Sequence, residues 1–154
     1  YQCKVPVFFG LVNAGFGNLW RWVRGLTVSQ TAGEKTEVFV AKSMYAAFDP
    51  ANIGEGMRKT CECPQREGYI IKKSYEGLCC MPTSVGGSTA TYYCDYFWTN
   101  AATQTGLRVR AAGGCVDAGT NAGASYSTAL NAASTTSAGY SSPLCFFEED
   151  PQIE

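Results

Sequence analysis

Histidine is absent from the sequence. Imidazole is the usual general base near neutral pH and a common metal ligand, so its absence excludes His-dependent catalytic triads and His-ligated metal sites. The carboxylates are scattered, with none of the visible pairing that acid–base hydrolysis needs. Asp95 lies inside an apolar run, and we interpret it as a solvent-facing or salt-bridged residue. We therefore expect no enzymatic activity, no catalytic residue and no cofactor.

Charge is also sparse. Charged residues make up 16% of the chain and the formal net charge is -1, against roughly 25% charged residues in an average soluble protein. A balance this close to neutral gives no general attraction to nucleic acid. We expect no nucleic-acid partner, and a surface that favours association with other copies of the chain.

Long apolar runs and glycosylation sequons are missing as well. No stretch reaches the 18 or so apolar residues that a transmembrane helix needs. None of the six asparagines has Ser or Thr two residues later, so we expect no N-glycosylation.

Cysteine, in contrast, is abundant. An even number of cysteines spread along a chain of this size is typical of extracellular proteins, and full pairing into disulfides is expected. The chain begins with Tyr1 rather than Met, as removal of a signal peptide would leave it. We therefore predict a secreted or cell-surface protein. The eight cysteines predicted to form disulfides are Cys3, Cys61, Cys63, Cys79, Cys80, Cys94, Cys115 and Cys145.

Two cysteine clusters, Cys61-Glu62-Cys63 and Cys79-Cys80, also suggest a zinc site. Zinc-binding pairs are usually separated by two or more residues, however, so we predict disulfides and no metal. Adjacent or once-removed cysteines are rarely spaced for a relaxed disulfide. The clusters must therefore pair with each other or with the four remaining cysteines, and the pairing stays open.

Charge and composition divide the chain into three parts. Residues 1–60 carry +3, residues 61–110 carry +1 and residues 111–154 carry -5. We predict an apolar N-terminal arm or helix over residues 1–27 and a disulfide-rich β core over residues 28–118. Residues 119–154 are predicted to be a low-charge section, rich in Gly, Ala, Ser and Thr, that ends in an acidic tail and packs on the same domain.

Strand patterns dominate the middle of the chain. Alternating or β-branched runs cover residues 36–44, 68–75, 88–99 and 106–112. Residues 99–105 then form a hairpin loop between the last two runs. We expect a mainly β or α+β fold, built as a single disulfide-stapled antiparallel sheet or sandwich. Residues 125–136 are either an Ala-rich helix or an irregular loop.

The N-terminal arm allows two interpretations. Apolar residues within 8–26 have spacings that suit a helix, whereas residues 3–12 have the extended, Pro-containing character of a donated strand. The composition of residues 8–23, FFGLVNAGFGNLWRWV, resembles membrane-inserting peptides, including the fusion peptides of enveloped viruses, which implies a lipid-binding helix. The arm residues predicted to contact another copy or a membrane are Val5, Val7, Phe8, Phe9, Leu11, Val12, Phe16, Trp20 and Trp22.

The aromatic strand supplies a candidate ligand platform. Tyr92, Tyr96 and Trp98 fall on one face of the 88–99 run, and exposed aromatic faces suit the stacking of sugar rings. The alternative is that these side chains belong to the core.

Three functions follow. The first is an extracellular self-assembling structural subunit, pilus-like, filament-like or a surface coat, whose basic and acidic ends meet head to tail. The second is a secreted membrane-active toxin or effector that uses the N-terminal segment. The third is a carbohydrate-binding or adhesive module that uses the aromatic strand 92–98.

Overall fold

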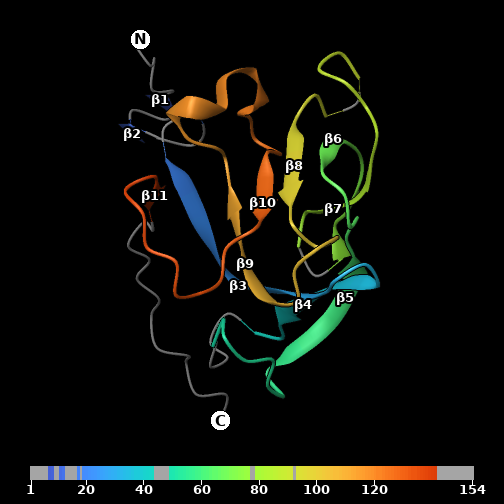
Figure 1. Ribbon diagram of the computed structural model, residues 1–154. Helices are drawn as coiled ribbons and strands as arrows, with labels where there is room; N and C mark the ends of the chain where they lie inside the picture. Colours follow the sequence, from blue (N-terminus) through green and yellow to red (C-terminus); the bar gives the residue numbers. More distant parts are fainter. Residues whose placement is uncertain are drawn as a thin grey trace.

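A computed structural model describes residues 7–8, 11–12, 17, 19–43, 49–76, 79–91 and 93–141. Of these residues 47% lie in strands and 6% in helical turns, which confirms the prediction of a mainly β fold. Figure 1 shows a curled sheet, with the short 3-10 helix η2 (Val116–Asn121) above one end. The strands are β1 (Val7–Phe8), β2 (Leu11–Val12), β3 (Trp20–Thr31), β4 (Lys35–Ala41), β5 (Met57–Glu62), β6 (Gly68–Ser74), β7 (Met81–Val85), β8 (Tyr96–Thr99), β9 (Gly106–Ala112), β10 (Ser127–Ala129) and β11 (Tyr140–Ser141).

The principal sheet has the strand order β5-β4-β3-β9-β10-β8-β6-β7, and β11 pairs with β3 beside this path. The first three strands form a meander, in which Val28 of β3 lies opposite Val38 of β4. In Figure 1, β3, β9, β10 and β8 stand side by side, and β4 and β5 turn across the base of the molecule toward β7. The sheet is therefore a half-barrel rather than a flat layer.

The interior of the half-barrel holds the main core. One cluster of buried side chains joins Val38 of β4, Met81 of β7 and Phe97 of β8, all with no exposed surface. Residues from opposite ends of the strand order touch one cluster only because the sheet curls around it. The core thus depends on the curvature of the sheet. A second cluster of buried residues, Trp20, Ala111 and Tyr126, lies on the opposite face.

A bulge in β3 directs the side chains of its two halves to opposite faces of the sheet. Trp22 pairs with Ala111 and Thr27 pairs with Val109, so residues 23–26 of β3 stand opposite residue 110 alone. Three extra residues are an odd number, and this reverses the side of the sheet to which later side chains point. Trp20 and Trp22 accordingly join the second cluster, whereas Leu26 and Val28 enter the main core. Gly25, at φ 79°, supplies the left-handed backbone of the bulge.

The predicted N-terminal helix is wrong from residue 20 onward, because Trp20–Thr31 form β3. Its β-branched residues gain ladder partners on both sides, in β4 and β9, which an isolated amphipathic helix would not have. Earlier in the chain, Val7–Phe8 pair antiparallel with Leu11–Val12. Val5, Phe9 and Phe16 of the predicted arm lie outside the described residues.

Three strand predictions are confirmed, over 36–44, 68–75 and 106–112, by β4, β6 and β9. The predicted 88–99 strand is too long, since only Tyr96–Thr99 form β8 and Cys94 before it has φ 55°. A turn in which the Cys94 N–H donates to the Thr91 carbonyl precedes β8. Residues 88–91 and Cys94 are exposed, and Tyr93 of this loop packs against the main core.

The predicted 99–105 hairpin and the purely antiparallel sheet are both corrected by β10. This strand lies between β8 and β9, parallel to the first and antiparallel to the second. Small side chains suit this crowded position, and all three residues of Ser127–Ala129 are buried. The same residues rule out the Ala-rich helix over 125–136. The fold is one curled mixed sheet rather than a sandwich.

The predicted disulfides are not found among the described residues. Cys61, Cys63, Cys79, Cys80 and Cys115 carry free thiols, and Cys3 and Cys145 lie outside the described part of the chain. The Sγ atoms of Cys61 and Cys79 are 3.8 Å apart and unbonded.

Candidate functional site

Aromatic side chains form a continuous row across the face of the sheet opposite the main core. Its rings come from β3 and β11, from the residue just before β10, and from β8 and β6. Tyr96 and Trp98 are neighbours on β8, whereas the other rings come from separate parts of the chain and are brought together by the strand order. In order across the sheet they are Trp22, Tyr140, Trp20, Tyr126, Trp98, Tyr96 and Tyr69.

Tyr140 lies in β11, where it pairs with Trp20 of β3. Its ring stacks on that of Trp22, with centroids 4.4 Å apart, and lies nearly parallel to that of Trp20 at 6.3 Å. Trp20 in turn meets Tyr126 at 4.6 Å. Offset and tilted pairs at these distances stabilise one another beyond the area they bury, so the rings form a firm wall.

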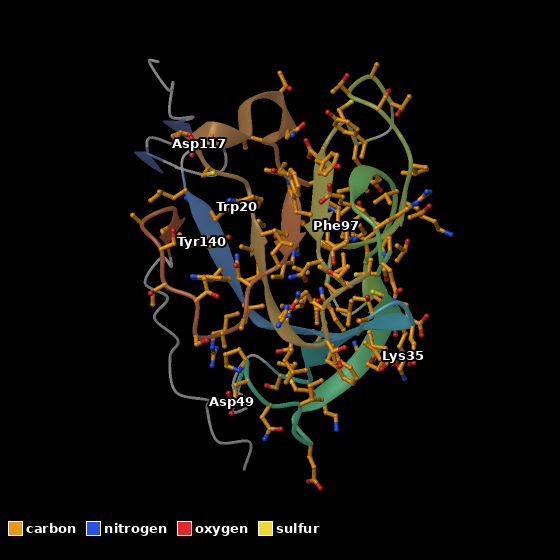
Figure 2. All side chains as sticks on the ribbon, in the orientation of Figure 1. Trp20, Lys35, Asp49, Phe97, Asp117 and Tyr140 are labelled. Atoms are coloured by element: carbon orange, nitrogen blue, oxygen red, sulfur yellow. The ribbon has the colours of Figure 1, made fainter. Side chains whose placement is uncertain are left out.

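A hollow of about 310 Å³ opens within this row. Four aromatic residues line it, Trp20, Trp98, Tyr126 and Tyr140, and the rest of its lining is Cys115, Asp117, Ala118, Thr128 and Leu130. Figure 2 shows Trp20, Tyr140 and Asp117 on one side of the molecule, with Phe97 in the interior of the sheet. This volume is at the lower end of the range for small-ligand sites, so the hollow suits one compact ligand.

The hydroxyl groups of the two lining tyrosines are held in place by hydrogen bonds. The Trp98 Nε1–H donates to the Tyr126 hydroxyl oxygen, and the Asn131 Nδ2–H donates to that of Tyr140. Each phenol oxygen thus accepts one hydrogen bond and keeps its own O–H as a donor. Burial raises the pKa of Tyr126 to about 12 and also raises the pKa of Tyr140. Both phenols therefore stay protonated and neutral at physiological pH.

Asp117 supplies the carboxylate of the hollow. It lies in the first turn of η2 and is exposed to solvent. η2 is anchored to the sheet at its far end, because the Tyr69 hydroxyl donates to Asn121 Oδ1 at 2.9 Å. The hollow thus combines apolar ring faces, two neutral O–H donors and one acidic acceptor.

Asp95, the acid inside the apolar run, does not reach this hollow's lining and has a structural role. Its Oδ2 accepts a hydrogen bond from the Ser125 N–H at 2.6 Å. The turn formed by residues 123–125 is therefore held against the start of β8, and it leads into Tyr126. Gly123 is packed so closely that a Cβ there would overlap the Asp95 carboxylate.

We predict that Gly123→Ala lowers the free energy of unfolding by about 1–3 kcal/mol, because the added methyl group displaces Asp95 and breaks its hydrogen bond to Ser125. Urea denaturation followed by fluorescence measures the change. Gly139→Ala is the matched control, since its nearest neighbour would be 3.7 Å away. Equal stability of the two variants would contradict this role for Asp95.

The predicted platform residues are partly brought together. Tyr96 and Trp98 lie in the aromatic row, with centroids 5.0 Å apart, and Trp98 lines the hollow. Tyr92 lies outside the described residues. Trp20 and Trp22, predicted as contacts to a membrane or another copy, are part of this row instead of a helix. For Val7, Phe8, Leu11 and Val12 the structure describes the strand pairing but not the side chains.

Sequence reasoning missed Tyr126, Tyr140 and Asp117 as site residues. Tyr126 and Tyr140 are isolated aromatics in a section dominated by Gly, Ala, Ser and Thr, so no periodic pattern marks them. Their isolation is itself a signal, because a bulky ring in such a section needs a dedicated place to pack.

No group of three or more Cys, Asp or Glu residues within the described ranges is arranged to hold a metal ion. In the same part of the chain, no helix is long and apolar enough to cross a membrane. Comparison of the chain with protein families, with curated proteins and with solved structures finds no match.

Proposed function

We propose that this protein is an extracellular carbohydrate-binding module that holds a sugar ring in the aromatic hollow. The observation that carries the proposal is the joint lining of one hollow by Trp20, Trp98, Tyr126 and Tyr140. Sugar rings present C–H faces that pack on aromatic rings and hydroxyl groups that need hydrogen-bond partners at their edges. Sites for such ligands combine apolar walls with a few fixed polar groups.

The polar groups support an uncharged, hydroxyl-bearing ligand. The Tyr126 and Tyr140 hydroxyls are neutral donors because burial raises the pKa of both. Asp117 at the rim is an acceptor for a sugar hydroxyl. Among the lining residues it is the one carboxylate, whereas glycosidic hydrolysis normally uses two carboxyl groups about 5–10 Å apart. The proposal is therefore binding without cleavage.

A glycan array tests the proposal, with wild-type protein compared with Trp98→Ala and Tyr75→Ala. Tyr75 is the matched control, since it is an exposed aromatic residue that does not line the hollow. We expect binding to one glycan class, a loss of at least 10-fold in affinity for Trp98→Ala and no change for Tyr75→Ala, since removal of one stacked ring costs about 1.5 kcal/mol or more. Trp98→Phe, which keeps a ring, separates loss of stacking from loss of folding.

A quaternary ammonium ligand is the competing occupant, because aromatic cages with a nearby carboxylate also bind such cations. Choline is therefore titrated in parallel. Binding of choline with no binding to any glycan would overturn the sugar assignment and leave the hollow as a cation site.

Affinity for the glycan is expected to stay constant from about pH 6 to about pH 9. Tyrosine ordinarily ionises near pH 10, and burial raises the pKa of Tyr126 to about 12. Its O–H donor is therefore lost only when the pH rises toward that value. Isothermal titration at several pH values measures this, and a decline in affinity centred between pH 6 and pH 9 would contradict the proposed role of the phenols.

The self-assembling subunit and the membrane-active effector remain predictions. Both depend on the N-terminal segment, and the head-to-tail contact also needs the acidic tail; most of these residues lie outside the described ranges. Negative-stain imaging of concentrated protein tests the first by the presence of regular filaments. Leakage from lipid vesicles tests the second.

A further inference from the structure

The two end strands of the sheet approach each other at a cysteine pair. β5 begins the strand order and β7 ends it. Cys61 lies in β5, and Cys79 lies two residues before β7. Their Sγ atoms are 3.8 Å apart, so this contact spans the seam along which the half-barrel would close.

Both sulfur atoms are held in position by neighbouring groups. The Cys79 thiol donates to the Ser74 carbonyl at 3.5 Å, and the Thr60 hydroxyl donates to the Cys61 sulfur at 3.9 Å. The backbone of Cys79 is fixed by Arg110, whose Nη1–H donates to the Cys79 carbonyl at 2.8 Å. Arg110 is itself 6% exposed, which places a buried positive charge beside Cys79.

We propose that Cys61 and Cys79 form a disulfide that joins β5 to β7 and closes the seam of the half-barrel. A disulfide requires the sulfurs to approach to about 2.0 Å, and the two Sγ atoms already face each other at 3.8 Å. The pairing unites the two clusters, Cys61-Glu62-Cys63 and Cys79-Cys80, that cannot readily pair within themselves. The bond would link residues from opposite ends of the strand order.

The oxidation needs a disulfide donor such as oxidised glutathione. The Cys61 thiolate attacks one glutathione sulfur and releases the first glutathione thiolate. Cys79, once deprotonated, attacks the Cys61 sulfur of the mixed disulfide and releases the second. The two protein thiols lose two electrons and two protons, and one oxidised glutathione becomes two reduced molecules.

The surroundings favour Cys61 as the attacking group. A hydrogen bond with Cys63 lowers the pKa of the Cys61 thiol and raises that of Cys63, and burial further raises the latter. Burial also raises the pKa of Cys79. Cys61 therefore carries the thiolate, whereas Cys63, 7% exposed, stays a protonated and protected thiol.

Peptide mapping identifies the partners. Protein equilibrated with oxidised and reduced glutathione is denatured at acidic pH, alkylated in the denatured state so that the buried Cys63 thiol is also blocked, and cleaved after glutamate without reduction. Cleavage at Glu62 separates the peptide 56–62, which holds Cys61, from the peptide 63–67, which holds Cys63. We expect the first to be linked to the peptide that begins at residue 77. The link must persist in Cys63→Ser and Cys80→Ser and disappear in Cys61→Ser and Cys79→Ser. A link from Cys63, or alkylation of both Cys61 and Cys79, would overturn the proposal.

Stability gives an independent readout. Because the bond encloses residues 62–78, oxidation should lower the unfolding equilibrium constant of the wild type by about 100-fold relative to the reduced protein. Cys61→Ser should remove this redox dependence, and Cys115→Ser, outside the seam, should retain it. Equal redox dependence in Cys61→Ser and in the wild type would contradict the pairing. These outcomes are separate from glycan binding, since neither cysteine lines the hollow.

Discussion

Phe97→Ala is expected to lower the free energy of unfolding by about 3–5 kcal/mol, the range for removal of a buried phenylalanine ring. Phe97 has no exposed surface and lies in β8, in the core that unites both ends of the strand order. The interior is enclosed by a curled sheet whose backbone is fixed by ladder hydrogen bonds, so it cannot collapse to fill the cavity.

Chemical denaturation of wild type, Phe97→Ala and Phe97→Leu measures the effect, and the leucine variant should retain most of the stability. Phe39→Ala is the matched control, because Phe39 lies in β4 and is only half-buried. Similar losses for Phe97→Ala and Phe39→Ala would contradict a half-barrel core centred on Phe97.

Gly114→Ala is expected to lower the free energy of unfolding by about 2–4 kcal/mol and to disrupt the hollow. Gly114 has φ +80°, and a Cβ there would lie 2.5 Å from Cδ1 of Tyr126. The substitution therefore adds backbone strain to a clash with a ring that is only 3% exposed. Movement of this ring breaks the hydrogen bond that Tyr126 accepts from Trp98.

Gly119→Ala separates the two causes. Gly119 also has a positive φ, 55°, but an added Cβ would meet nothing within 4 Å. Because its ψ of -129° places Gly119 outside the left-handed helical region, we expect this variant to lose about 1–3 kcal/mol from backbone strain alone and to keep the glycan affinity of the wild type. Equal losses of glycan affinity in both variants would show that Tyr126 does not depend on the space at Gly114.

The sequence predicted those strands whose pattern and partners are local. β4 and β6 follow alternation or β-branched runs, which report burial on one face. β10 could not be predicted in this way, because Ser127–Ala129 carry no pattern and gain their place from β8 and β9. The bulge in β3 was also hidden, since Trp20 to Val28 reads as a single periodic face until pairing with β9 inserts its extra residues.

The residues of the candidate site were also predicted only where a local pattern marks them. Trp98 was a candidate because its strand alternates aromatic residues, and it lines the hollow. Trp20 was identified for a different reason, as part of an apolar arm, and pairing of β11 with β3 places it beside Tyr140. That parallel pairing joins residues 120 positions apart, and no local sequence pattern indicates a contact of this kind.

The claim that a sugar ring occupies the hollow is tested most directly by the indole N–H signals in a two-dimensional ¹⁵N NMR titration with the array-selected glycan. The chain has three tryptophans, and Trp22→Phe and Trp98→Phe assign their signals. We expect the Trp98 and Trp20 signals to shift on saturable binding, because both side chains line the hollow. Saturable glycan binding that leaves both signals unmoved would contradict this claim.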